Sequence, residues 1–191
     1  MKGYDYTLSG AYFVTICVEG GKCLLGDVAA DEMQLNAAGV VVLNCWNALQ
    51  QRFDGAVVDA SIVMPNHFHG IIFLLGDDRA EVETKYSSEW AATRAAPTAG
   101  TGDDGVEAGK KDTGDSAVPS LGSVVGAFKS ITTNEYIRGI RDYGWSGFER
   151  RLWQRNYWER IIRNERELEA IQRYIWLNPA SWKKDRLNPG N

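Results

Sequence analysis

Cysteine is scarce in this chain of 191 residues. The three cysteines, Cys17, Cys23 and Cys45, are an odd number, and no two of them have CxxC spacing. A disulfide framework needs pairs of cysteines and a thiolate zinc site needs closely spaced ligands, so the pattern argues against both. We expect three reduced and partly buried thiols.

Long apolar runs are absent as well. No run approaches the length of about 20 residues that spans a bilayer, and residues 1–10 lack the apolar core of a signal peptide. We therefore expect a cytoplasmic protein of the bacterial cytosol or nucleoid. The length suits one well-buried domain, and we expect residues 1–191 to form it.

Basic residues are outnumbered by acidic ones, 21 to 25, which gives a formal net charge of -4. Binding to a phosphate backbone usually draws on a cationic surface, so this total argues against nucleic acid. The distribution points the other way, because residues 120–191 hold 13 basic and 8 acidic groups, and 10 of the basic ones are arginine. The planar fork of arginine suits phosphate, although a solvated helix face is also rich in arginine. The charge is thus compatible with DNA binding without establishing it.

The first 75 residues alternate between strand and helix patterns. Residues 11–18 are rich in aromatic and β-branched side chains and end at a Gly-Gly turn, which predicts a strand. Residues 35–49 carry apolar side chains at three- and four-residue steps, which predicts an amphipathic helix. Residues 56–63 and 67–75 are β-rich and are joined by a short connection containing Pro65, which predicts an antiparallel pair.

The composition changes between residues 76 and 119. Gly, Ala, Thr, Asp and Glu dominate this segment, apolar residues are few, and no periodicity persists. The segment therefore reads as a flexible low-complexity insertion within the domain. A structureless loop of this length is uncommon in a compact domain, but the composition favours a linker on the surface.

Regular structure is predicted again from Ser120, a suitable N-cap for a helix that runs to about residue 140. Residues 151–162 mix aromatic and basic side chains and are expected to hold a short fourth strand.

A better-marked helix is predicted to begin at Asn164. Glu167 completes a capping box, an apolar stripe follows at three- and four-residue steps, and Pro179 marks the predicted end. The order strand, helix, strand, strand, helix, strand, helix indicates an α+β fold. We expect a ferredoxin-like, RRM-like antiparallel sheet with the helices packed on one face.

His67 and His69 are the two histidines of the chain. Residues i and i+2 of a strand point to the same face, so the two imidazoles can lie side by side as metal ligands while Phe68 enters the opposite layer. The alternative is a pair of hydrogen-bonded histidines on a half-exposed strand, and the spacing alone favours that alternative. An apolar strand is, however, an unusual place for two histidines.

Tyr174 and Asn178 are four residues apart on the last predicted helix, which places them on one side, at the margin of its apolar stripe. A side chain at that margin can face a neighbouring cleft. A tyrosine that packs its ring at the edge of the core fits the same spacing and is the commoner arrangement. Spacing alone does not choose between the two.

Four segments of the chain resemble the REP-associated tyrosine transposases, relatives of the single-tyrosine insertion-sequence transposases of the HUH superfamily. They are YDYTLSGAYFVTICVEGGKCLLGDV, VMPNHFHGIIFL, SLGSVVGAFKS and LWQRNYWERIIRNERELEAIQRYIWLNP. The match covers nearly the whole chain except the predicted insertion. Its most specific parts are PNHFHG, which resembles the family's His-hydrophobic-His motif, and RYIWLNP, which resembles its Tyr-x-x-x-Asn-Pro helix.

The resemblance implies a transposase, an HUH-type endonuclease that cuts and rejoins single-stranded DNA beside hairpins. It implies His67 and His69 as ligands of Mg²⁺ or Mn²⁺, with Asn178 as a third ligand through its amide oxygen. It implies Tyr174 as the nucleophile, which forms a 5′-phosphotyrosine intermediate. Two neutral imidazoles and an oxygen ligand leave positions open on such an ion for a scissile phosphate, so the chemistry agrees.

Other readings of the same residues stay open. One is a domesticated protein that binds hairpin DNA with little or no transposition activity, and another is a metal-free nucleic-acid binder in which the histidines are structural. Similar transposases often act as dimers, so a homodimer is a further hypothesis. Insertion-sequence relatives commonly have glutamine at the position of Asn178, and the shorter amide leaves the third ligand in question.

Tyr157 is the main rival of Tyr174 as nucleophile, because it lies among polar and basic residues. We favour Tyr174, since only it has an amide partner one helical turn on and matches the family motif. The candidate DNA-binding residues are Lys129, Gln154, Arg155, Asn156, Tyr157 and Arg160. Lys129 is also a candidate for stabilising charge at the reacting group, although a solvated surface lysine is the commoner arrangement. Trp153 and Trp158 suit base stacking and core packing equally.

Overall fold

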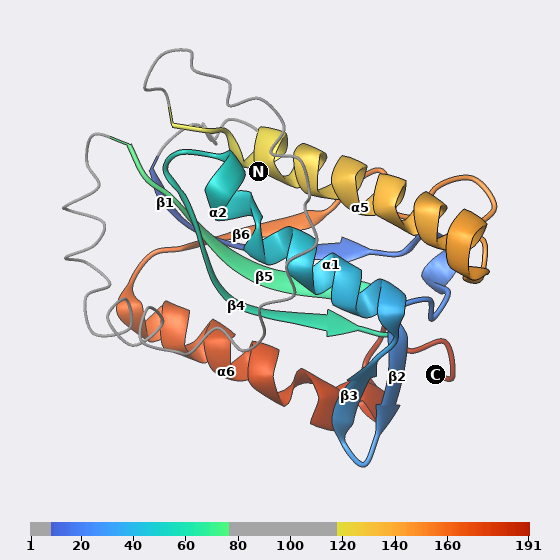
Figure 1. Ribbon diagram of the computed structural model, residues 1–191. Coiled ribbons are helices and arrows are strands. Elements are labelled where there is room, and N and C mark those ends of the chain that lie inside the picture. Colours follow the sequence, from blue (N-terminus) through green and yellow to red (C-terminus); the bar gives the residue numbers. More distant parts are fainter. Residues whose placement is uncertain (1–8, 77–117) are drawn as a thin grey trace.

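The computed structural model describes residues 9–76 and 118–191 (Figure 1). The predicted insertion of residues 76–119 therefore lies, apart from its ends, outside the described residues. Within the described ranges, no helix combines the length and apolar character needed to cross a membrane. The three cysteines are free; Cys17 is buried and Cys23 is exposed.

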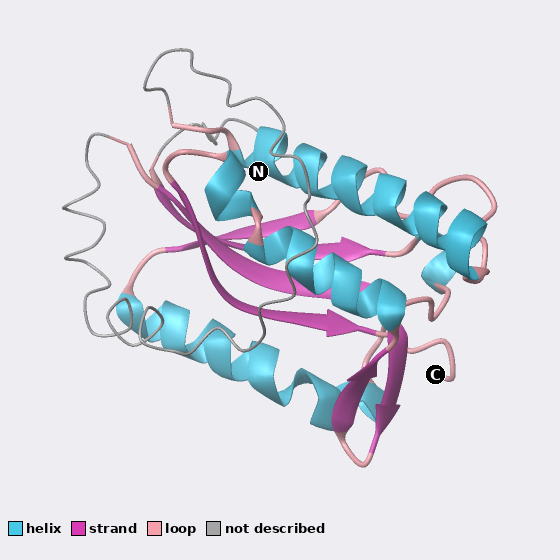
Figure 2. Cartoon of the chain, in the orientation of Figure 1, coloured by secondary structure: helices cyan, strands magenta, loops and turns pink. Residues whose placement is uncertain are grey.

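A four-stranded antiparallel sheet forms the centre of the fold (Figure 2). Its strands are β1 (Gly10–Cys17), β4 (Ala56–Met64), β5 (His67–Leu74) and β6 (Trp158–Ile162). They lie in the order β4-β5-β1-β6, so β1 and β5 occupy the two central positions. This order, with helices between the strands, confirms the predicted ferredoxin-like α+β fold. The fourth strand predicted within residues 151–162 is confirmed as β6.

Two helices cover one face of this sheet. They are α1 (Ala37–Asn47) and α5 (Leu121–Tyr143), with the short α2 (Leu49–Arg52) following α1. Phe68 packs between them, with its ring centroid 4.7 Å from that of Trp46 and 5.2 Å from that of Phe128. Gly70 is required by this packing, because a Cβ there would lie 2.6 Å from Cζ2 of Trp46. Phe68 and Gly70, which follow His67 and His69 in the chain, thus form part of the core on the other face of the sheet.

Helix α6 (Glu165–Ser181) packs against the opposite face of the sheet (Figure 1). Its stripe of Leu168, Ile171 and Ile175 is buried against side chains of β1 and β5 that point away from α1 and α5. The prediction of helices on one face thus describes α1 and α5, whereas α6 covers the second face. Both faces of the central strands are apolar and need a cover, but the order of elements does not say which helix supplies it.

A small hairpin between β1 and α1 was not predicted. It consists of β2 (Gly26–Ala29) and β3 (Glu32–Leu35). Ala30 and Asp31 form its turn, with φ angles of 52° and 61°. In hairpin turns this left-handed conformation is usually adopted by Asn-Gly or by glycine. The sequence lacks that signal, which is why the hairpin could not be recognised. A one-turn 3-10 helix, η1 (Glu19–Gly21), precedes it.

The predicted helix starts are confirmed by their caps. Oγ of Ser120 accepts from the backbone N–H of Ser123, and Oδ1 of Asn164 accepts from that of Glu167. The predicted end at Pro179 is wrong, because α6 continues to Ser181. A proline removes one N–H bond to the preceding turn and its ring crowds the carbonyl four residues earlier, which can kink a helix instead of ending it. The chain then turns through the 3-10 helix η2 (Trp182–Lys184).

Candidate active site

His67 and His69 lie side by side on β5 and face helix α6. Both side chains are buried, and their ring centroids are 4.6 Å apart. The antiparallel register places Thr15 of β1 opposite His69, and Trp158 of β6 opposite Thr15. One row of side chains therefore runs across the sheet from the histidine to the edge strand. The predicted placement of both imidazoles on one face agrees with this geometry.

The tautomer of His67 is determined by its neighbour Asn66. Nδ2 of Asn66 donates to the carbonyl oxygens of Gly21 at 3.0 Å and Leu187 at 2.7 Å, which fixes the orientation of the amide. Oδ1 of Asn66 lies 2.9 Å from Nδ1 of His67 and can only accept, so Nδ1 carries the proton. Nε2 of His67 is therefore a bare acceptor, and it is buried without a hydrogen-bond partner.

His69 is held at both ring nitrogens. Its Nδ1 lies 2.8 Å from Oγ1 of Thr15, and its Nε2 lies 3.4 Å from the hydroxyl of Tyr174. Phe13 stacks on the ring with a centroid distance of 5.3 Å. These contacts fix the plane of the imidazole against the tyrosine of α6.

Tyr174 and Asn178 reach the histidines from α6. The tyrosine is half exposed, at 49%, whereas Asn178 is buried. Their exposure therefore differs, although the sequence places both at the margin of the same apolar stripe. Oδ1 of Asn178 is a second buried acceptor without a hydrogen-bond partner. The Asn178 side chain is near enough to both His67 and Tyr174 to raise the pKa of the first and lower that of the second. The structure thus brings together the four predicted site residues His67, His69, Tyr174 and Asn178.

Burial dominates the electrostatics of this site. Desolvation lowers the pKa of His67 to about 4, against smaller raising effects of Asp185 and Asn178. Desolvation, with a smaller effect of His67, lowers the pKa of His69 to about 3. Both imidazoles are therefore neutral at pH 7, as a metal ligand must be. Desolvation also raises the pKa of Tyr174, so its hydroxyl is protonated at that pH.

Asp185 is a neighbour of the site that the sequence did not reveal. It follows η2, and its Oδ2 lies 4.0 Å from Nε2 of His67. Nothing in the local sequence marks it, because its proximity arises only when η2 folds the chain back beside Asn66. Within residues 9–76 and 118–191, no group of three or more His, Cys, Asp or Glu side chains is placed to hold a metal ion.

Two hollows meet at Tyr174. One is lined by Thr15, His69, Trp158, Tyr174, Asn178, Ser181, Lys184, Asp185, Arg186 and Leu187. The other is lined by Phe13, Arg160, Asn164, Arg166, Glu167, Ala170, Ile171 and Tyr174. Together we call them the tyrosine groove. Trp158 is 60% exposed at the edge of this groove. The basic side chains of the groove come from β6, from α6 and from the segment after α6.

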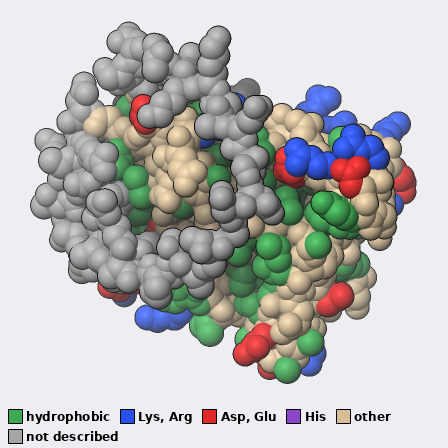
Figure 3. Space-filling view, in the orientation of Figure 1, with side chains coloured by type: hydrophobic (Ala, Val, Ile, Leu, Met, Phe, Trp, Pro, Cys, Tyr) green, Lys and Arg blue, Asp and Glu red, His purple; other side chains and the backbone are tan. Residues whose placement is uncertain are grey.

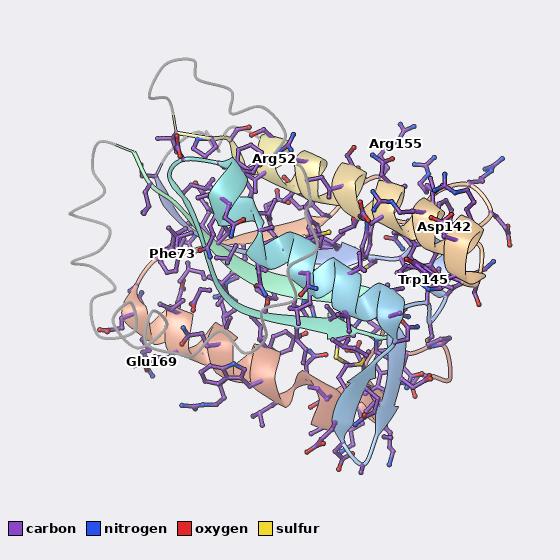
Figure 4. All side chains as sticks on the ribbon, viewed as in Figure 1. Arg52, Phe73, Asp142, Trp145, Arg155 and Glu169 are labelled. Carbon is purple, nitrogen blue, oxygen red and sulfur yellow. The ribbon has the colours of Figure 1, made fainter. Side chains whose placement is uncertain are left out.

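The predicted DNA-binding residues are divided between two places. Arg160 lines the tyrosine groove. Lys129, Gln154 and Arg155 line a separate hollow beside α5. Figure 4 shows Arg155 beside α5, across the sheet from Glu169 of α6. Lys and Arg side chains gather over the C-terminal part of α5 in Figure 3.

Lys129 binds backbone carbonyl groups and does not line the hollows beside Tyr174. Its Nζ donates to the carbonyl oxygens of Gln154, Arg155 and Asn156 at 3.0 to 3.3 Å. It also lies over the ring of Tyr157, 5.2 Å from the centroid.

The structure also separates the aromatic residues that could contact DNA from those that pack in the core. Tyr157 packs against the core on the α1 and α5 side of the sheet, away from the histidines. Trp153 is buried there and donates from Nε1 to Oγ1 of Thr132. Of the two tryptophans considered for stacking, only Trp158 is exposed.

Comparisons with known proteins give matches in structure and in sequence. No family model matches the chain. A solved REP-associated tyrosine transposase bound to a REP hairpin is 17% identical, with a TM-score of 0.48 over 95% of this chain and 74% of that one. A Deinococcus radiodurans structure described as a candidate transposase is 13% identical, with a TM-score of 0.43 over 92% of this chain and 94% of that one.

An uncharacterized protein of Haemophilus influenzae is 32% identical over 187 residues, which cover 98% of this chain and 89% of that protein. Because this identity extends along nearly the whole of both sequences, the chain belongs to the same family as the Haemophilus influenzae protein.

Proposed function

We propose that this protein is a metal-dependent transposase, a DNA endonuclease and strand transferase that cuts and rejoins single-stranded DNA beside hairpins through Tyr174. One observation carries the proposal. Beside the contact between Tyr174 and His69 lie two buried acceptors without a donor, Nε2 of His67 and Oδ1 of Asn178. Buried polar atoms normally have partners, and a cation is a partner that acceptors alone can share.

The residues fit a divalent ion. His67, His69 and Asn178 would hold it, through two neutral imidazoles and an amide oxygen. A bound Mg²⁺ or Mn²⁺ would withdraw negative charge from a scissile phosphate and make the phosphorus more open to attack. Asn66 and Thr15 keep the two rings in orientation from behind, as the outer partners of metal-binding histidines do.

Tyr174 would act as the nucleophile. Its oxygen forms a bond to phosphorus while the bond to the 3′ oxygen of the preceding nucleotide breaks. The phenolic proton passes through solvent to that leaving oxygen, so the products are a 5′-phosphotyrosine and a free 3′ hydroxyl. Rejoining reverses these changes with another 3′ hydroxyl. The half-exposed position of Tyr174 between two hollows lets a strand reach it from either side.

Single-stranded DNA is the substrate that the groove supports. Trp158 offers an exposed ring for stacking, and Arg160, Lys184 and Arg186 supply positive charge along the path of a phosphate backbone. The hairpin beside the single strand follows from the resemblance of the sequence segments. Tyr174 meets His69 of its own chain, so the proposed site does not require a second copy.

The proposal is tested by trapping the intermediate. Labelled hairpin DNA with a single-stranded flank is incubated with the protein and Mn²⁺, and a denaturant-resistant protein–DNA adduct is sought. Wild type and Tyr157→Phe should form it, whereas Tyr174→Phe should not. An adduct in Tyr174→Phe, or none in wild type, would contradict the mechanism. Tight hairpin binding without an adduct would instead support a domesticated binding protein.

A further inference from the structure

The segment after α6 places a carboxylate beside the proposed metal site. The Asp185 side chain is only 14% exposed, and its Oδ2 lies 4.0 Å from the bare Nε2 of His67. Because Nδ1 of His67 carries the proton that Asn66 accepts, Nε2 has no proton to donate to this carboxylate. The carboxylate therefore faces an acceptor at a position where a cation would satisfy both.

The orientation of Asp185 is built into its turn. Oδ1 accepts from the backbone N–H of Leu187 at 2.7 Å, which leaves Oδ2 as the oxygen that faces His67. The carbonyl oxygen of the same Leu187 accepts from Nδ2 of Asn66, the residue that sets the tautomer of His67. One short segment thus holds both the carboxylate and the support of the neighbouring imidazole.

We propose that Asp185 is a further ligand of the metal ion held by His67 and His69, an inference that rests on the proposed function. Two ligand atoms that are each about 2.1 Å from one ion are at most about 4.2 Å apart, and the separation of Oδ2 and Nε2 lies inside that limit. Among the described residues, no three His, Cys, Asp or Glu side chains are placed to hold a metal ion, so binding would have to draw Oδ2 inward. A carboxylate is a harder ligand than the Asn178 amide and suits Mg²⁺ and Mn²⁺.

The test measures metal binding by the full chain without DNA. Mn²⁺ is titrated and the free ion is followed by electron paramagnetic resonance for wild type, Asp185→Asn and Asp185→Glu. Asparagine can keep the turn to Leu187, so Asp185→Asn removes the charge rather than the fold. We expect its affinity to fall about tenfold or more. Glu169→Gln on the outer side of α6 makes the same change of charge and should bind like wild type (Figure 4).

The outcomes separate this inference from the proposed function. Equal affinity of wild type and Asp185→Asn would overturn the role of Asp185 alone, provided that His67→Ala and His69→Ala lose binding. Absence of Mn²⁺ binding by wild type would overturn both. Asp185→Glu keeps a carboxylate and should retain more affinity than Asp185→Asn. Equal losses in these two variants would assign Asp185 a structural role instead.

Discussion

The hydroxyl of Tyr174 lies 3.4 Å from Nε2 of His69, although the two residues belong to different elements and are 105 positions apart. This contact depends on the plane of the imidazole, which Thr15 fixes from the other side at Nδ1. The sheet register, rather than the helix, therefore aims the histidine at the tyrosine.

Thr15→Val should weaken Mn²⁺ binding, since valine has the shape of threonine but no hydroxyl to hold Nδ1 of His69. Loss of such an outer partner costs a metal site about 10- to 100-fold in affinity. Thr15→Ser restores the hydroxyl and should restore most of the affinity. Isothermal titration with Mn²⁺ measures both. Wild-type affinity in Thr15→Val would show that the threonine does not support the site.

Asn66→Ala should also lower Mn²⁺ affinity, for a different reason. Without the Asn66 amide, Nδ1 of His67 loses its acceptor, and the ring can adopt the other tautomer with a proton on Nε2. We expect a loss of about tenfold or more. Asn47→Ala, at the exposed end of α1, is the matched control and should leave affinity unchanged. Nitrogen NMR shifts of His67 would report the tautomer directly.

The metal-free protein should lose stability as the pH falls from about 6.5 towards 4. The unfolded chain protonates both histidines near pH 6.5, whereas burial lowers the pKa values in the folded chain to about 4 for His67 and about 3 for His69. Between these pH values the unfolded state binds more protons than the folded state. The free energy of unfolding therefore decreases as the pH is lowered, by up to about 1.4 kcal/mol per pH unit for each histidine. Urea unfolding at several pH values measures the slope.

The control for this pH dependence is the double variant His67→Gln and His69→Gln, which keeps polar side chains that do not titrate. Its free energy of unfolding should depend less on pH between 6.5 and 4. An unchanged slope would mean that carboxylates, rather than the two histidines, cause the acid sensitivity.

Trp158→Ala should weaken binding of a single-stranded oligonucleotide. A base stacked on an aromatic side chain contributes about 1 to 3 kcal/mol, and Trp158 is the exposed ring beside the tyrosine groove. Trp176→Ala offers a matched control, because Trp176 is 64% exposed on α6 but does not line the groove. Fluorescence anisotropy measures the affinities. Equal losses in both variants would place the strand elsewhere.

Lys129→Met should reduce stability more than DNA cleavage. Removal of its ammonium group leaves the carbonyls of Gln154, Arg155 and Asn156 without that donor, which we expect to cost about 1 to 3 kcal/mol of unfolding free energy. Lys183→Met, at an exposed position, should cost little. Denaturant unfolding compares the two. A cleavage defect without a loss of stability would instead support a role of Lys129 in acting on DNA.

Local signals in the sequence predicted most of the elements. The β-rich composition of residues 56–63 and 67–75, and the caps at Ser120 and Asn164, depend on neighbouring residues and could be recognised without the fold. The placement of α6 on the second face could not, because an amphipathic helix pattern does not state which sheet face it covers.

For the candidate site, the sequence supplied the residue types but not their supports. His67 and His69 share a face because of strand periodicity, so their proximity could be predicted. Thr15 and Asp185 enter the site through strand register and a turn, which join residues distant in the chain. Contacts of that kind depend on the completed fold and leave no local pattern.

The two hydrogen bonds of the Asn66 amide have a consequence for the order of events during synthesis. One goes to Gly21 and the other to Leu187, so the support of His67 joins an early segment of the chain to a late one. A nascent chain can form β1, β4 and β5 before α6 has been made, but Asn66 stays without its second acceptor until the ribosome has passed Leu187. The support of His67 in the proposed metal site would therefore be complete only after the segment following α6 has been translated and has docked.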